Sequence, residues 1–412
     1  MTIDTADLLE RFLRYVQIDT RSDEKSTTTP STPGQWDLLR LLEAEMRGLG
    51  LADVALTEHG YALATLPATR ATATPVIAWF AHVDTATNLP SAAKPIVHRA
   101  YAGQPIVLPD DPSQVLSVEH TPFLRDAIGH DVITASGTTL LGADDKAGVA
   151  IVMAAVRHLR RHPEIPRGKI RICFNPDEEI ARGVHRLDLA QLGADCGYTL
   201  DGAAPGEIDF ETFSADSASL EIHGVAAHPG WAKGAMVNAT RLAGRFLAAL
   251  PPELSPERTA DRAGFIHPVE CIGSAEHARV RMILRDFELA GLAAHRSRLE
   301  AIVAGLRAEE PRARFELTFT EQYRNMRYWL EQDRRPVEFA QEAIRRAGLV
   351  PKSQAIRGGT DGSNLTQRGL PTPNLFAGMH EVHSPREWVS LQDMAKAVET
   401  LVHLAQVWVQ RP

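Results

Sequence analysis

The sequence has few cysteines and no long apolar run. Its 412 residues include three cysteines and no Cys-x-x-Cys pair, so neither a disulfide framework nor a thiolate zinc site is expected. The longest apolar run, residues 149–156, is far below the roughly 18 to 20 residues that a membrane-spanning helix needs. The first residues also lack the basic and apolar segments of a secretory signal. These absences predict a cytoplasmic protein without a membrane partner.

Positive charge is in the minority. Lys plus Arg total 44 against 52 for Asp plus Glu, a net charge of -8, so nucleic acid is not expected as a partner. The apolar fraction of 44% and the charged fraction of 23% are those of an ordinary globular protein, which excludes a largely disordered chain. Because a single hydrophobic core stops growing at about 250 to 300 residues, we expect two domains.

Hydrophobic periodicity predicts how these domains are arranged. Short apolar runs at 75–81 and 169–174 are typical of buried strands, and the helix expected around 149–159 is apolar on almost every side. From about residue 213 the order becomes strand, helix, strand, strand, helix, strand, as in a split β-α-β unit. We therefore predict an α/β fold: a discontinuous domain with a central mixed sheet, residues 1–212 and 325–412, and an inserted ferredoxin-like α+β domain, residues 213–324.

Acids and histidines gather where the predicted strands end. His82 and Asp84 are two residues apart after the first run, so both side chains point to one side at a carboxyl end, where α/β sheets place ligands. Three consecutive acids, 177–179, follow the second run, and Asp201 and the segment 379–383 follow others. Oxygen and imidazole ligands without thiolates suit zinc, manganese or cobalt used for hydrolysis.

Two neighbouring carboxylates, Asp144 and Asp145, stand at the start of the apolar helix. Helix capping explains one of them, at about 1 kcal/mol. A second carboxylate adds repulsion unless a cation offsets it. Together with the acids and histidines at the strand ends, this pair predicts a two-metal hydrolase.

A series of motifs runs through nearly the whole chain. They lie at residues 82–85, 140–148, 176–179, 228–230, 232–234, 236–239, 285–287 and 356–362. In this order they resemble the peptidase T family of tripeptide aminopeptidases, within the superfamily of two-zinc aminopeptidases, carboxypeptidases and aminoacylases. The resemblance implies a zinc-dependent enzyme that hydrolyses the N-terminal peptide bond of short peptides, tripeptides in particular. It also implies that the inserted domain is a lid that binds substrate, and a homodimer through this lid is a further expectation.

The resemblance implies a metal centre with two Zn²⁺ per subunit, for which Mn²⁺ or Co²⁺ could substitute. Asp144 would bridge the two ions. His82 and Asp201 would complete one site, and Glu179 and His383 the other.

The resemblance also implies roles around the metals. Glu178 would be the general base, and Asp84 would accept the second N–H of His82 and so fix its tautomer. Arg357 would hold a substrate carboxylate, and His228 would polarise the scissile carbonyl. The other lid candidates for substrate contact are Asn238 and Arg285.

Some alternatives stay open. Residues 379–386 differ from the tyrosine-rich sequence common in the family, so His380 competes with His383 as the last ligand, although alignment from residues 374–376 favours His383. Asn175 stands where the family usually has threonine. A related metallo-carboxypeptidase, dipeptidase or aminoacylase would use the same centre. A non-catalytic, metal-bound peptide-binding protein is the alternative from another class, and the presence of Glu178 argues against it.

Overall fold

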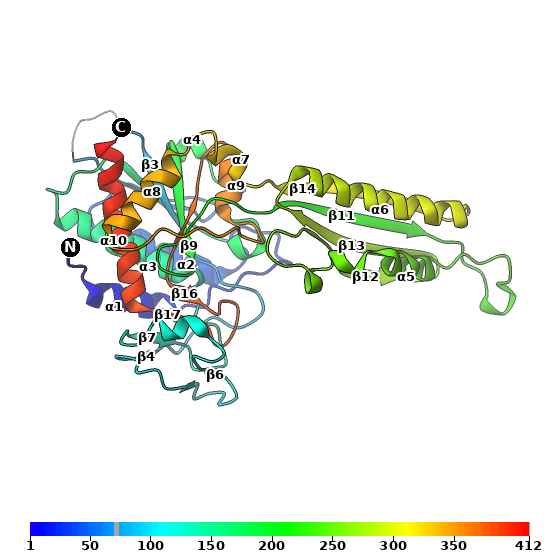
Figure 1. Ribbon diagram of the computed structural model, residues 1–412, viewed down its shortest axis with the longest axis horizontal. Helices are drawn as coiled ribbons and strands as arrows, with labels where there is room; N and C mark the ends of the chain where they lie inside the picture. The colour runs from blue at the N-terminus through cyan, green and yellow to red at the C-terminus, as the bar shows by residue number, and fades with distance from the viewer. Residues whose placement is uncertain (70–73, 412) are drawn as a thin grey trace. The chain divides into compact units, whose positions relative to one another are not determined.

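The computed structural model describes residues 1–69 and 74–411, and these residues form two compact units (Figure 1). Unit 1 comprises Met1–Phe210, Tyr328–Gln354 and Thr360–Pro412, and unit 2 comprises Glu211–Arg327 and Ala355–Gly359. The short segment Ala355–Gly359 therefore belongs to unit 2, whereas the sequence analysis placed it in the discontinuous domain. Within the described ranges, no helix has the length and apolarity needed to cross a membrane.

Unit 1 is built on a sheet that has seven strands in the part of the chain described. Their order is β1-β2-β8-β3-β9-β15-β10. The neighbours β8, β3, β9 and β15 are parallel, and the outer strands are antiparallel, so the predicted mixed sheet is confirmed. The strands are β1 (Ala52–Leu56), β2 (Ala62–Leu66), β3 (Ile77–His82), β8 (Ile170–Asn175), β9 (Cys196–Gly202), β10 (Ile208–Asp209) and β15 (Asn374–Phe376).

Helices cover this sheet. The predicted apolar helix is α3 (Ala143–Arg161), which packs on β3 and β9 and is also in contact with α1 and α10. Its residues from Lys146 to Val156 are all buried, which explains why it is apolar on nearly every side. The other helices are α1 (Thr5–Tyr15), α2 (Pro33–Gly48), α4 (Leu189–Leu192), α7 (Arg327–Leu330), α8 (Arg335–Arg346), α9 (Asp361–Gln367) and α10 (Leu391–Gln410). Ser390 caps α10 by accepting the N–H of Asp393.

A second, smaller sheet of unit 1 has the order β16-β17-β7-β4. Its strands are β4 (Ile96–His98), β7 (Val132–Thr134), β16 (Met379–His380) and β17 (Trp388–Ser390), and the hairpin of β5 (Ile106–Val107) and β6 (Val115–Leu116) pairs separately. The loop between β16 and β17 carries His383, so this sheet holds both ends of the segment that contains this predicted ligand.

Unit 2 has the predicted order β-α-β-β-α-β. Its antiparallel sheet, β12-β13-β11-β14, packs one face against α5 and α6 through alternate strand residues such as Leu220 and Met282. The opposite face carries polar residues such as Ser217, Ser219 and Arg281. The elements are β11 (Ser214–His223), α5 (Ala239–Ala249), β12 (Phe265–Gly273), β13 (His277–Asp286), α6 (Leu289–Glu309) and β14 (Arg314–Tyr323).

Candidate metal centre

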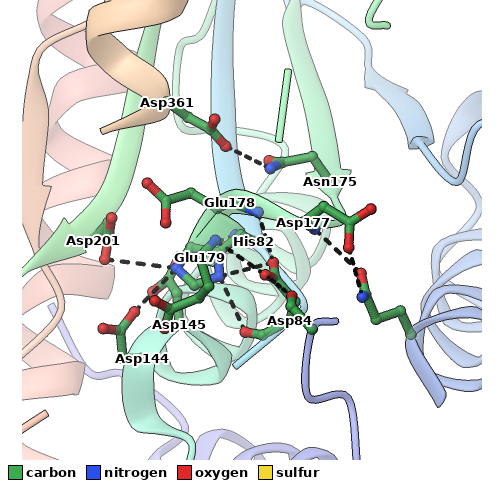
Figure 2. A network of polar contacts seen from close by, with 12 residues as sticks. His82, Asp84, Asp144, Asp145, Asn175, Asp177, Glu178, Glu179, Asp201 and Asp361 are labelled. Carbon is green, nitrogen blue, oxygen red and sulfur yellow. Dashed lines mark hydrogen bonds and ion pairs between the residues drawn. The ribbon is translucent and has the colours of Figure 1, made fainter. Parts of the chain in front are cut away.

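His82 lies at the carboxyl end of β3, at the centre of a group of acidic side chains (Figure 2). Its Nδ1 atom is 3.1 Å from the carbonyl oxygen of Asp84 and 3.3 Å from Asp84 Oδ1. Either acceptor places the ring proton on Nδ1, so Nε2 is left with its lone pair. Nε2 is 3.0 Å from Asp144 Oδ1 and 3.8 Å from Asp201 Oδ1. The His82 ring therefore points its ligand atom at the two carboxylates that the sequence analysis paired with it.

Asp144 is held at the start of α3 by a third acid. The backbone dihedrals of Asp144 and Asp145 are not helical, so the regular helix begins at Lys146. The buried carboxylate of Glu387 accepts the N–H of Gly142 at 2.8 Å and the N–H of Asp144 at 2.9 Å. The Asp144 side chain is therefore not needed as a helix cap, and its carboxylate faces His82 and His383.

Glu178 and Glu179 follow β8 in a short 3₁₀ turn, Glu178–Ile180. Their two backbone N–H groups both donate to the buried carboxylate of Asp84, at 3.0 and 3.1 Å. Asp84 therefore fixes this turn and the ring of His82 at the same time. The carboxylates of both glutamates lie among the acids around His82 (Figure 2).

The structure distinguishes between the two candidate histidines that follow β15. Nε2 of His383 lies 3.2 Å from Asp144 Oδ2 and 2.9 Å from Glu179 Oε1. His380 is instead buried in a stack of rings, with centroids 5.0 Å from Phe123 and 4.4 Å from Trp388. Burial lowers the pKa of His380 to about 4. The contacts thus bring His383 into the cluster and give His380 a packing role.

Asp145, the residue after Asp144, has no role predicted from the sequence. Its carboxylate is fully buried and accepts the N–H of His82 at 3.2 Å and the N–H of Gly148 at 3.1 Å. A Cβ at Gly148 would lie 2.3 Å from Asp145 Oδ1, so glycine is required there. Among the described residues, Asp145 also forms, with His82 and Asp201, one of two groups whose ligand atoms lie within 4.8 Å of one another, the other being His82, Asp144 and Glu179. Its hydrogen bonds make it an anchor between β3 and α3.

The distances within the cluster suit shared metal ions. Two ligand atoms bound to zinc in a tetrahedral site are about 3.4 Å apart, and the spacings given above lie between 2.9 and 3.8 Å. Glu179 Oε1 is buried and has no partner in hydrogen-bonding geometry among the described residues, even though His383 Nε2 is close. An ion between the two groups would satisfy both atoms.

The electrostatics of the cluster also suit cations. Burial raises the pKa of Glu179 to about 7, that of Asp201 to about 6 and that of Glu178 well above its usual range. Burial acts in the same direction on Asp144, but its hydrogen bonds with His383 and His82 outweigh it and hold the pKa well below normal. The polar contacts that His383 makes with Asp144 and with Glu179 raise the pKa of His383 to about 10. Two divalent cations would stabilise the ionised forms of Glu179 and Asp201 in place of protons.

The predicted substrate residues of unit 2 each have partners inside that unit. Arg357 donates to the carbonyl oxygens of Asp261 and Ala263 and to Thr259 Oγ1, and its guanidinium lies over the ring of Phe213. Asn238 caps α5 by accepting the N–H of Arg241.

The remaining two also have neighbours within unit 2. Arg285 donates to Gln322 and lies over the ring of Tyr323. His228 is exposed, and its Nδ1 accepts the N–H of Gly230 at 3.1 Å, which leaves the ring proton on Nε2.

Comparison with known proteins agrees with this geometry. The family profile described as Peptidase family M20/M25/M40 matches residues 114–407. Peptidase T of Geobacillus kaustophilus (strain HTA426) is 43% identical over 406 residues, which cover 98% of this chain and 99% of that protein. This chain belongs to the peptidase T group of peptidase family M20/M25/M40. The resemblance drawn from the motifs is therefore confirmed.

Solved structures with the same fold come from this family as well. The aminopeptidase PepT of Bacillus cereus superposes with a TM-score of 0.76 at 22% identity, covering 99% of each chain. A Bacillus subtilis protein described as a dinuclear metal-binding peptidase of the M20 family superposes with a TM-score of 0.68 at 14% identity, again over 99% of each chain. These likenesses show that this member of the M20 family has the family fold.

Some residues of the site carried little signal in the sequence. Glu387 could be noticed only as an acid four residues after His383. Ser22, which donates to Asp84, carried none, because its partner is 62 residues away along the chain. The same is true of Ser31 and Gln35, whose partner Asp177 is more than 140 residues away.

Proposed function

We propose that this protein is a two-metal aminopeptidase that releases the N-terminal residue of short peptides, tripeptides in particular. The observation that carries the proposal is the convergence of one ligand set, His82, Asp144, Glu179, Asp201 and His383, beside a further acid that none of the predicted metal sites uses, Glu178. The relatives named Peptidase T and the fold neighbour described as dinuclear support it.

Two Zn²⁺ are the proposed cofactors, with Mn²⁺ or Co²⁺ as substitutes. The ligands are carboxylates and imidazoles, a set that these borderline ions share. His82 and Asp201 are assigned to one ion, Glu179 and His383 to the other, and Asp144 to both. When bound, such cations lower the pKa of a water molecule toward about 7 and polarise a peptide carbonyl.

Glu178 is the proposed base. Asp84 accepts the backbone N–H of Glu178 and thereby fixes the turn that carries the Glu178 carboxylate. In the reaction Glu178 takes a proton from the attacking water and delivers it to the amine that leaves. Asp84 assists by holding Nδ1–H of His82, which keeps Nε2 free for a metal.

Residues of unit 2 are proposed to contact the peptide. Because Nδ1 of His228 accepts the N–H of Gly230, Nε2 carries the ring proton. Nε2–H can then donate to the scissile carbonyl oxygen. The Arg357 guanidinium has five N–H donors in all, so it can donate to a terminal carboxylate alongside its contacts within unit 2. Asn238 and Arg285 are the further candidates.

Two other expectations belong to this proposal. Cytoplasmic location is supported by the three free cysteines, two of them buried, which suit a reducing compartment. A homodimer through unit 2 is supported by Val269 and Ile272 on β12, which are 46% and 57% exposed.

A product assay tests the function. The purified protein, with added zinc, manganese or cobalt, is given Ala-Ala-Ala, its N-acetylated and C-amidated forms, Ala-Ala and an N-acyl amino acid. Release of one residue and a dipeptide from unblocked Ala-Ala-Ala alone is expected. Cleavage of the acylated substrates in preference would move the protein to the carboxypeptidase or aminoacylase branch. No hydrolysis with any metal at any pH would favour the peptide-binding alternative.

A further inference from the structure

Asp177 differs from the two glutamates that follow it. Figure 2 shows its carboxylate directed away from His82, on the opposite side from Glu178 and Glu179. The side chain is completely buried. A buried carboxylate that binds no cation is costly unless hydrogen bonds satisfy it, so its partners show what it does.

Among the described residues, the hydrogen-bond donors to the Asp177 carboxylate are Ser31, just before α2, and Gln35, in the first turn of α2. Its carboxylate accepts the N–H of Ser31 at 2.9 Å, the hydroxyl of Ser31 at 2.5 Å and the side-chain amide of Gln35 at 2.8 Å. Its own N–H donates to Gln35 Oε1 at 3.2 Å. Gln35 therefore grips both the side chain and the backbone of one residue, and Gln35 and Ser31 are themselves buried.

The backbone of the turn explains why such a grip is needed. Asp177 has φ 57° and Ala181 has φ 55°, so residues with a Cβ occupy the left-handed region on both sides of the 3₁₀ turn that carries Glu178 and Glu179. This conformation is unfavourable for them and persists only where surrounding contacts enforce it. The hydrogen bonds from Ser31 and Gln35 are such contacts.

The start of α2, which carries Gln35, is itself held in place. A Cβ on Gly34, in the first turn of α2, would lie 1.8 Å from the carbonyl oxygen of Asp19, so only glycine permits this approach. Asp19 in turn accepts the hydroxyl of Ser91 at 2.9 Å. The start of α2 is thus packed against the chain segment that precedes it.

We propose that Ser31 and Gln35 form a clamp on Asp177 that positions Glu178 and Glu179, and that they are positioning residues for the metal centre. The turn is then held at two points, with Asp84 gripping the N–H groups of the glutamates and the clamp gripping the residue before them. The effect on turnover rests on the proposed function, whereas the effect on metal binding does not.

The clamp is tested with Gln35→Ala, and with Asp37→Ala as a control on the same helix. Asp37 is exposed, and its ion pair is with Arg40. We expect Gln35→Ala to lower kcat for Ala-Ala-Ala and to weaken zinc binding in a calorimetric titration, each by about 10 to 100-fold, with KM changed less than twofold. Asp37→Ala should match the wild type in all three.

A charge exchange guards against simple misfolding of the variant. In Asp177→Asn the amide N–H₂ must face a donor, either the Gln35 amide or the N–H of Ser31. Gln35→Glu alone presents a second carboxylate to Asp177, so both variants should lose activity and zinc affinity. In the double variant Asp177→Asn/Gln35→Glu the amide N–H₂ of residue 177 can donate to the carboxylate of residue 35. Its kcat and zinc affinity should be at least tenfold higher than those of either single variant.

Wild-type values of kcat and zinc affinity in Gln35→Ala would overturn the clamp, as would equal losses in the double and single variants. A wild-type protein that binds zinc but cleaves no peptide would overturn the proposed function instead. In that case a weaker zinc affinity in Gln35→Ala would still support the clamp.

Discussion

Two groups of carboxylates in the candidate site differ in what holds them. In the first, the ligand face, Asp144, Glu179 and Asp201 have histidine ring nitrogens as side-chain partners. In the second, the anchoring side, Asp84, Asp177 and Glu387 accept backbone N–H groups. Side chains of the same type thus have two roles: some are placed to bind a metal ion, and others hold the backbone segments that carry these ligands.

This difference explains why the site needs so many acids. A carboxylate whose oxygens accept N–H bonds can remain buried without a metal, whereas one surrounded by other acids cannot ionise freely. Burial and the neighbouring Asp144 raise the pKa of Glu179 and of Asp201, but burial also raises the pKa of the anchoring acid Glu387 to about 7. The hydrogen-bond partners, and not the pKa values, therefore distinguish the two groups. Each anchoring acid also joins segments far apart in the sequence, so it fixes where the ligands meet. The comparison predicts different consequences when each side is changed.

The largest effect is expected beside the ligand face, from Glu178→Ala. If Glu178 is the base, kcat for a tripeptide should fall by about 10² to 10⁴-fold while two metals stay bound, because this acid is not a ligand. Steady-state kinetics together with metal analysis of the purified variant measures both. Turnover like that of the wild type would remove Glu178 from this role.

The next effect is expected on the anchoring side, from Glu387→Gln. The amide would place its own N–H₂ against the N–H of Gly142 or of Asp144, which Glu387 now accepts at 2.8 and 2.9 Å. Metal affinity should fall by about 10 to 100-fold, as titration with zinc would show. Glu381→Gln, in the same loop but facing Arg386, is the matched control and should keep the affinity. Equal affinities in both variants would contradict the anchoring role.

The two histidines after β15 sharpen the comparison further. His383→Ala should halve the metal content, because the ion assigned to Glu179 and His383 loses a ligand. His380→Ala should keep both metals and lose stability only, because His380 packs between Phe123 and Trp388. Plasma emission analysis of the dialysed variants measures the content. The reverse result would show that the ligand is His380.

The smallest effect concerns pH. In the metal-free protein the folded pKa values of Glu179, about 7, and Asp201, about 6, lie above their ordinary values of 4.5 and 3.8. The folded state therefore holds more protons than the unfolded state between pH 4.5 and 7, and these groups make stability fall as pH rises. Metal binding needs the ionised forms, so zinc should raise Tm by several degrees more at pH 7.5 than at pH 5.5. Thermal melts with zinc and with EDTA provide the measurement, and an equal rise at both pH values would contradict it.

The sequence predicts the ligand face better than the anchoring side. His82, Glu179 and Asp201 stand at or just after the ends of parallel strands, and the apolar periodicity that predicts those strands also places them at one edge of the sheet. Asp144 follows from the start of α3, where capping leaves one of two acids unexplained.

The anchoring side depends on contacts that no local pattern reports. Gln35 reaches Asp177 across 142 residues, and Glu387 reaches Asp144 across 243. Asp84 was predicted for its contact with His82, but not for the two N–H groups that it accepts from the turn. The segment Ala355–Gly359 groups with unit 2 for a similar reason, because Ile356 pairs with Glu211 and Phe213, which are distant in sequence.

The most direct test of the two-metal centre is its stoichiometry. Equilibrium dialysis of the wild-type protein against zinc should give two ions per chain, and Asp144→Ala, which removes the carboxylate shared by both sites, should give fewer than one. A single ion in the wild type, or two ions retained by Asp144→Ala, would contradict the assignment of Asp144 as the bridge between His82 and His383.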